Sequence, residues 1–233
     1  AMARADRIVT LTELEQAIII RNSDGVADKQ LVQTMPSSIL YANYKKGLKP
    51  PAKTDRLVIG TIIRLVEDKG VQYLIQAFVR LANAHPNIEL WIVGEGDYRD
   101  ELEHLAVNHK RIRFWGHQSN QSKFLGRFDI FVQPAVYEGW GRTIKEAMYF
   151  GLPIIGSDVG GIAQQITHGK NGVLFEPENV PELESLLEKL IRDSKLRKSL
   201  GANASKKAKA DGDFIQLFED VMLPIFEEVT EGK

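Results

Sequence analysis

Two glutamates and a glycine-bracketed turn form the stretch of this chain best suited to chemistry. Glu138 opens the turn EGWG, and Glu146 follows it eight residues later. Glycine lets backbone amides come close to a ligand, and the first turn of a helix beginning near Arg142 has N–H groups without helical partners. Carboxylates accept hydrogen bonds from sugar hydroxyl groups. The stretch is a candidate sugar-binding site, although an ordinary surface helix after a tight turn has the same pattern.

A second candidate site lies between two cations. Arg64 and Lys69 flank a short loop that follows an apolar run, and Gly70 opens a predicted helix. A helix amino end and two cationic side chains can converge on one anion, so the spacing is typical of a phosphate site. The alternative is a solvated loop in which Glu67 and Asp68 pair with their neighbours.

Two further glycine pairs follow predicted strands. Gly94 and Gly96 resemble the start of a dinucleotide fingerprint, but Arg99 stands where the third glycine belongs, and no acidic residue ends a following strand. A nicotinamide dehydrogenase is therefore disfavoured. The pair Gly160–Gly161 offers further backbone donors, or else serves a turn that needs positive φ.

Several classes of site lack their signatures. The chain has no cysteine, its five histidines show no ligand spacing, and there is no Ser-His-Asp order or nucleophile elbow. We therefore expect no metal centre. The net charge of −1 gives no reason to expect nucleic acid as a partner. No apolar run approaches the roughly 20 residues that span a bilayer. We expect a cytoplasmic protein, with peripheral attachment to a membrane as the alternative for the full protein.

The elements that must position these residues alternate along the chain, which is typical of a parallel sheet covered on both faces. We predict an α/β fold with a Rossmann-like six-stranded parallel sheet, helices on both faces and a helical C-terminal tail. The predicted strands are 56–63, 87–93, 111–114, 129–133, 153–157 and 173–175. The predicted helices are 70–84, 98–107, 142–150, short ones near 123 and 162, and 180–192, 195–210 and 214–229. The candidate residues then lie at the carboxyl edge, where open α/β sheets bind ligands.

The first residues do not continue this alternation. A short strand at 7–12, a helix at 13–20 and a strand within 28–34 precede a stretch at 36–53 that is typical of a linker. We predict three parts: residues 1–53, a main domain at 54–212, and a last helix at 213–233.

Taken together, these motifs resemble the carboxyl-terminal domain of the retaining glycosyltransferases of the GT-B fold, the glycogen synthase-like and sucrose synthase-like family. The resemblance rests on four segments: RLVEDKG, VGEGDYRDELEHLA, the run from RFDIFVQPAVYEGWG to SDVGG, and NGVLFEP. It implies that the main domain is one half of a GT-B fold. It also implies a nucleoside diphosphate sugar as donor, no cofactor, and no metal in the active site.

The resemblance implies a role for each matching position. Arg64 and Lys69 hold the donor diphosphate and stabilise charge on the departing nucleotide, and Glu138 sits at the donor sugar; these three are the catalytic candidates. Glu146 accepts from the ribose hydroxyls. The remaining donor-binding candidates are Gly94, Gly96, Trp115, Gly116, His117, Gly139, Trp140, Gly141, Arg142 and Thr143.

The chain departs from the family pattern in three ways. Ile63 replaces a glycine beside the diphosphate loop, and Ala163-Gln164 stand where Pro-Glu is usual, which removes a carboxylate. The family's amino-terminal, acceptor-binding domain is absent: residues 7–12 resemble only its last strand, and 214–229 the helix that crosses back to it. We expect this chain to bind nucleotide but catalyse little by itself. We also expect self-association through an uncovered apolar face that includes residues 18–20.

Three other hypotheses stay open. One is a non-catalytic nucleotide-sugar-binding module that works with a separate acceptor domain. The second is a sugar-nucleotide epimerase built on the same fold, and the third a structural domain that has lost its ligand. The base, the donor sugar and the acceptor are not encoded in any pattern of side chains here.

Overall fold

A computed structural model describes residues 8–10, 13–23, 32–34, 52 and 54–211 of the chain. The chain divides into two units, one of residues 1–44 with 211–233 and one of residues 45–210. The predicted linker, apart from residue 52, and the predicted helix 214–229 lie outside the described residues, and the predicted domain boundaries stay predictions.

The smaller unit contains a two-stranded parallel sheet. Strand β1 (Ile8–Thr10) pairs with β2 (Val32–Thr34), and helix α1 (Glu13–Arg21) lies between them in the sequence. The sequence predicted all three elements, within a few residues. On α1, the side chain of Ile18 is exposed.

The larger unit is built on a six-stranded sheet, in which every pair of neighbouring strands among the described residues is parallel. The strand order is β5-β4-β3-β6-β7-β8. The predicted fold class is therefore confirmed, and observed strands end within one residue of the predicted ones. The strands are β3 (Leu57–Ile62), β4 (Ile88–Val93), β5 (Ile112–Phe114), β6 (Ile130–Gln133), β7 (Ile154–Ser157) and β8 (Val173–Phe175).

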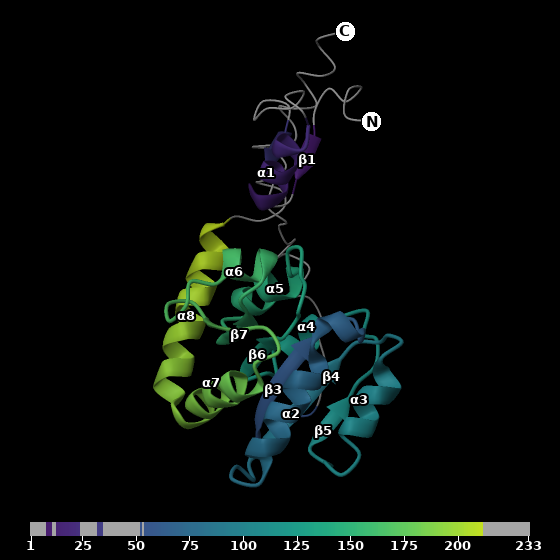
Figure 1. The fold of residues 1–233 in the computed structure, drawn as a ribbon. Helices are drawn as coiled ribbons and strands as arrows, with labels where there is room; N and C mark the ends of the chain where they lie inside the picture. Colours follow the sequence, from purple (N-terminus) through teal and green to yellow (C-terminus); the bar gives the residue numbers. More distant parts are fainter. Residues whose placement is uncertain (1–7, 11–12, 24–31, 35–51, 53, 212–233) are drawn as a thin grey trace. The chain divides into compact units, whose positions relative to one another are not determined.

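Helices cover the sheet in two groups (Figure 1). Helix α2 packs against α3 and α7, whereas α5 packs against α4, α6 and α8. In the described part of the chain, none of the helices is both long and apolar enough to cross a membrane. The helices of this unit are α2 (Val71–Ala82), α3 (Arg99–Leu105), α4 (Ser122–Leu125), α5 (Arg142–Tyr149), α6 (Gly160–Gln165), α7 (Val180–Arg192) and α8 (Ser194–Ala210), with the 3-10 turn η3 (Glu67–Lys69).

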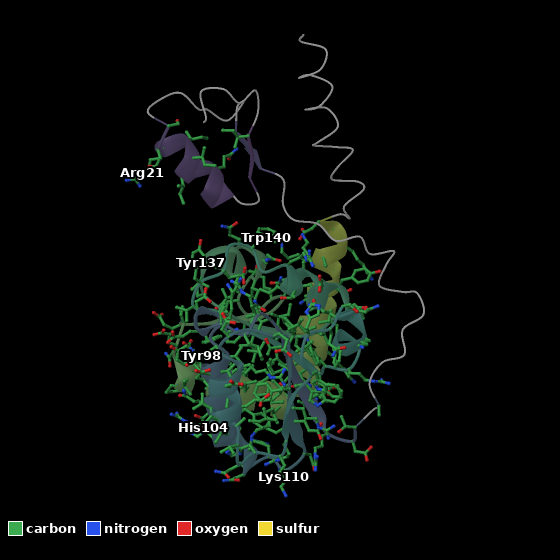
Figure 2. The ribbon with its side chains drawn as sticks, turned by 90° about the vertical axis from the view of Figure 1, so that its right-hand side faces the viewer. Arg21, Tyr98, His104, Lys110, Tyr137 and Trp140 are labelled. Carbon is green, nitrogen blue, oxygen red and sulfur yellow. The ribbon has the colours of Figure 1, made fainter. Side chains whose placement is uncertain are left out.

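The direction of the chain reverses at the centre of the sheet. From β3 it proceeds outward through β4 to β5, and then returns to place β6 on the other side of β3. In parallel α/β sheets such a switch point opens a crevice at the carboxyl ends of the strands. Tyr137 and Trp140, which follow β6, lie at one end of this unit, and Lys110, which precedes β5, lies at the other (Figure 2). The loops after β3 and β6 therefore meet at the carboxyl edge.

A buried carboxylate on β4 binds side chains from the residue before β3, from β4 itself and from β5. Glu89 on β4 is 1% exposed; it accepts hydrogen bonds from Trp91 Nε1 at 2.9 Å and from Arg56 at 2.8 Å, and Arg113 lies 3.2 Å away. Burial raises the pKa of Glu89, but the hydrogen bonds from Trp91 and Arg56 and the charges of Arg113 and Arg56 outweigh it and leave the pKa lowered. The ionised form is thus favoured by folding.

We expect Glu89→Gln to destabilise the fold by about 2 kcal/mol near neutral pH, since charge-assisted hydrogen bonds contribute roughly this much. Because the folded pKa lies below the unfolded value of 4.5, this contribution is present above 4.5 and lost as the pH falls through the folded pKa. Denaturant unfolding of both proteins at neutral and acidic pH measures it. An equal difference at both pH values would contradict the assignment.

Candidate active site

The centre of the candidate site is a lysine–glutamate pair from two different loops. Lys69 ends η3 after β3, and Glu138 lies in the loop after β6. Lys69 Nζ is 3.4 Å from Glu138 Oε2 and donates a hydrogen bond to the carbonyl of Tyr137 at 2.7 Å. The two side chains are only 12% and 19% exposed. The loop between the two cations and the EGWG turn, which the sequence singled out as separate candidate sites, therefore meet at one point.

Backbone contacts hold these two loops together. The amide of Val136 donates to the carbonyl of Asp68 at 2.8 Å. Gly70 has φ +67°, and a Cβ there would lie 2.0 Å from the carbonyl oxygen of Pro134. No other residue type fits that position without moving a backbone, so Gly70 is what allows η3 to approach the loop after β6.

The remaining contacts of Glu138 come from its own loop and helix. Glu138 Oε1 accepts a hydrogen bond from the amide of Gly141 at 3.2 Å, and Gln133 Nε2 lies 3.5 Å from Oε2. Thr143 Oγ1 in turn lies 3.3 Å from Gln133 Oε1. Sequence reasoning missed Gln133; the available signal was a polar residue at the end of an otherwise apolar strand. The Glu138 carboxylate is thus oriented from several sides.

The double glycine stabilises the turn, and the amide of Gly161 is not available as a hydrogen-bond donor to a ligand. The amide of Gly161 donates to the carbonyl of Glu138 at 3.1 Å, so it is already engaged. A Cβ on Gly161 would lie 2.3 Å from the carbonyl oxygen of Gly139 and 2.4 Å from Trp140 Cα. Gly160 has φ +41°. Of the two interpretations of this pair, the structure favours the turn that needs glycine.

The loops after β4 and β5 complete the edge. The amide of Gly94 donates to the carbonyl of Gly116 at 3.0 Å. A Cβ on Gly94 would lie 1.8 Å from the carbonyl oxygen of Ile63, and one on Gly96 2.1 Å from that of Leu65. These two glycines therefore allow the loop after β4 to press against the segment that carries Arg64.

The backbone of Trp115 is engaged within the protein, because its amide donates to the carbonyl of Ile92 at 2.9 Å and its carbonyl accepts from Gln118 Nε2 at 2.7 Å. Its indole ring packs 4.9 Å from the ring of Trp91 and 5.2 Å from that of Phe124. The indole therefore belongs to an aromatic cluster at the core. His117, two residues later, is exposed.

Arg64 and Ile63 point to different environments. Ile63 belongs to the hydrophobic core, whereas Arg64 is exposed. The Ile63 side chain, which stands where the family usually has glycine, is therefore accommodated by the core. Within the described residues, the Arg64 side chain makes no hydrogen bond or ion pair, so its charge is available to a ligand.

Glu146 is buried more deeply than Glu138. Its side chain is 2% exposed, and its Oε1 lies 3.4 Å from Nε of Arg142, one turn earlier on α5. Arg142 itself is exposed. The predicted ribose contact of Glu146 stays a prediction, as do the donor roles of Gly139, Trp140 and Thr143.

A polar pocket of about 620 Å³ lies at the opposite, amino edge of the sheet, and it is not the predicted site. Three of its charged groups already have internal partners: Arg56 binds Glu89, Asp129 accepts from the amide of Val58 at 2.8 Å, and Arg197 donates to the carbonyl of Ile191 at 2.9 Å. In the part of the chain that the structure describes, no cluster of three potential metal-ligating side chains occurs.

Comparison with known proteins identifies a family. The family model described as "Glycosyl transferases group 1" matches residues 46–207. The capsular polysaccharide biosynthesis glycosyltransferase CapM of Staphylococcus aureus is 29% identical over 185 residues, which cover 77% of this chain and 49% of CapM. The chain thus spans about half the length of such curated relatives.

Solved structures of the same fold agree. Anabaena Alr3699/HepE, in complex with UDP and glucose, superposes with a TM-score of 0.82 at 22% identity, covering 94% of this chain and 62% of HepE. The C-terminal domain of LpcC, a glycosyl transferase group 1 family protein from Francisella tularensis, has a TM-score of 0.64 at 26% identity. That match covers 71% of this chain and 96% of the LpcC domain.

Proposed function

The chain belongs to the group 1 glycosyl transferases, and we propose that it forms the donor-binding half of a retaining enzyme of this family. Such an enzyme transfers a sugar from a nucleoside diphosphate sugar to an acceptor. The observation that carries the proposal is the Lys69–Glu138 pair. It places a cation that can bind a diphosphate next to a carboxylate that can accept hydrogen bonds from a sugar. A structure of HepE in complex with UDP-glucose supports this class of donor.

The two cations act on the leaving group. When the bond between the anomeric carbon and the diphosphate oxygen breaks, its electron pair stays on that oxygen. Lys69 is held by the Tyr137 carbonyl and mostly buried, so its charge is in place before the reaction and needs little reorganisation. Arg64, which is exposed, adds a second charge from the other end of the loop. Together they stabilise the departing nucleoside diphosphate.

Glu138 acts on the sugar. Its carboxylate accepts from Gly141 and lies beside Lys69, which leaves acceptor capacity for hydroxyl groups of the donor sugar. The oxygen of the acceptor hydroxyl then bonds to the anomeric carbon from the face that the diphosphate leaves and passes its proton to the departing diphosphate oxygen, so the configuration is kept. We place the acceptor site outside this chain, because the curated relatives are about twice as long.

Titration calorimetry tests the proposal. We expect the chain to bind at least one of UDP-, GDP- and ADP-glucose, and to transfer little sugar by itself. Absence of saturable binding for all three at millimolar concentration would overturn it.

We expect Glu146→Gln to weaken UDP binding more than pyrophosphate binding, because a ribose contact is absent from pyrophosphate. The control is Glu184→Gln, since Glu184 lies 3.4 Å from Arg80 as Glu146 does from Arg142, but on α7 and beside the last turn of α2. Calorimetry with both ligands measures the difference. Equal losses for the two ligands would mean that Glu146 does not bind ribose.

A further inference from the structure

A buried glutamine that was not among the predicted site residues donates hydrogen bonds to the backbone of the EGWG turn. Gln165 ends α6 and is 4% exposed. Its Nε2 donates to the carbonyl of Trp140 and, at 3.1 Å, to the carbonyl of Gly161. The side chain therefore ties the double glycine and the turn to each other.

The bond to Trp140 also acts on Glu138. The carbonyl of Trp140 and the amide of Gly141 belong to the same planar peptide unit, in which C=O and N–H point in opposite directions. Gln165 holds the carbonyl, and the N–H on the other side donates to Glu138 Oε1 at 3.2 Å. Fixing one end of this peptide thus aims the other end at the carboxylate.

Gln165 Nε2 is the hydrogen-bond donor that the described residues offer to the Trp140 carbonyl. Gly141 has φ +76°, and a Cβ on Gly139 would meet nothing within 4 Å, so the turn is open on its outer side, whereas on its inner side Trp140 Cα packs closely against Gly161. The bond from the Gly161 amide fixes the carbonyl of Glu138, which belongs to a different peptide unit. The orientation of the Gly141 amide therefore depends on Gln165.

We propose that Gln165 is a positioning residue: it orients the Trp140–Gly141 peptide so that the Glu138 carboxylate is held for the donor sugar. The part that concerns the sugar rests on the proposed function. Gln165 does not touch the donor, and its effect passes through one peptide unit and one carboxylate.

Gln165→Met tests this, because methionine keeps the volume of the side chain and removes the hydrogen-bond donor Nε2. We expect amide hydrogen exchange at Gly141 to rise roughly tenfold, while that of β6 and β7 is unchanged. UDP-glucose binding should weaken roughly three- to tenfold, as expected for one hydrogen bond, with UDP binding unchanged within about twofold. Gln164→Met is the control, since Gln164 is the exposed neighbour on the same helix.

The outcomes separate the two proposals. Unchanged exchange at Gly141 in Gln165→Met would overturn the inference whether or not the chain binds nucleotides. Equal losses for UDP and UDP-glucose would also overturn it, since a general loosening of the fold acts on both. If the unmodified chain bound no nucleotide sugar, the proposed function would fail, and the exchange measurement would still decide the role of Gln165.

Discussion

Arg64→Ala should weaken binding of a nucleoside diphosphate to this chain roughly ten- to hundredfold, the loss expected for a charge-assisted contact of about 1.5–3 kcal/mol. The Arg64 side chain is exposed and makes no hydrogen bond or ion pair within the described residues. Its removal therefore leaves no buried partner unsatisfied, and the stability of the fold should change little. Calorimetry with UDP, together with thermal unfolding, separates the two effects.

Arg80→Ala is the matched control for Arg64→Ala. Arg80 is likewise exposed and charged, but it lies near the end of α2 and pairs with Glu184. The control corrects for the change in net charge, which by itself weakens the attraction of any anion. If the two variants lost UDP affinity equally, Arg64 would not contact the diphosphate.

Gly161→Ala should lower both the stability of the fold and the affinity for the donor. Its Cβ would lie 2.3 Å from the carbonyl oxygen of Gly139 and 2.4 Å from Trp140 Cα, which are backbone atoms that cannot move aside as a side chain can. Overpacking of this kind costs about 1–3 kcal/mol. Relief requires displacing the turn that carries Glu138, so we expect the affinity for UDP-glucose to fall with the melting temperature.

Gly126→Ala is the control for this steric effect. A Cβ on Gly126 would have only ordinary contacts at 3.8 Å, and the residue does not need positive φ. The variant should unfold and bind as the unmodified chain does. A Gly161→Ala protein with unchanged stability and donor affinity would show that the turn does not rest on the double glycine.

The sequence was sufficient to predict the sheet because most of its strands are apolar runs that are buried on both faces. Apolar runs such as β4 and the amphipathic spacing of α2 depend only on local residues, and all six strands of the main sheet were predicted from them. Glu89 within β4 is the exception: its partners come from before β3 and from β5, so its burial follows from the strand order and not from the local pattern.

Most residues of the candidate site could be predicted from the sequence, but several of the contacts between them could not. Lys69 meets Glu138 because β6 lies beside β3, which the order of elements along the chain does not reveal. Gln165 escaped notice for the same reason, since its partners lie 24 or 25 residues earlier as well as in its own helix. Of the contacts that orient the Glu138 carboxylate, the one with Lys69 depends on such long-range packing, whereas those with Gly141 and Gln133 are local in the sequence.

Amide chemical shifts of the isotope-labelled chain, followed during titration with nucleoside diphosphate glucose, show at which edge of the sheet the donor binds. If the carboxyl edge binds the donor, the largest shifts will fall in residues 64–70, 94–96, 115–117 and 138–143 and will saturate together. Shifts gathered instead at 54–58 and 126–129, which line the pocket at the opposite edge, would contradict the account.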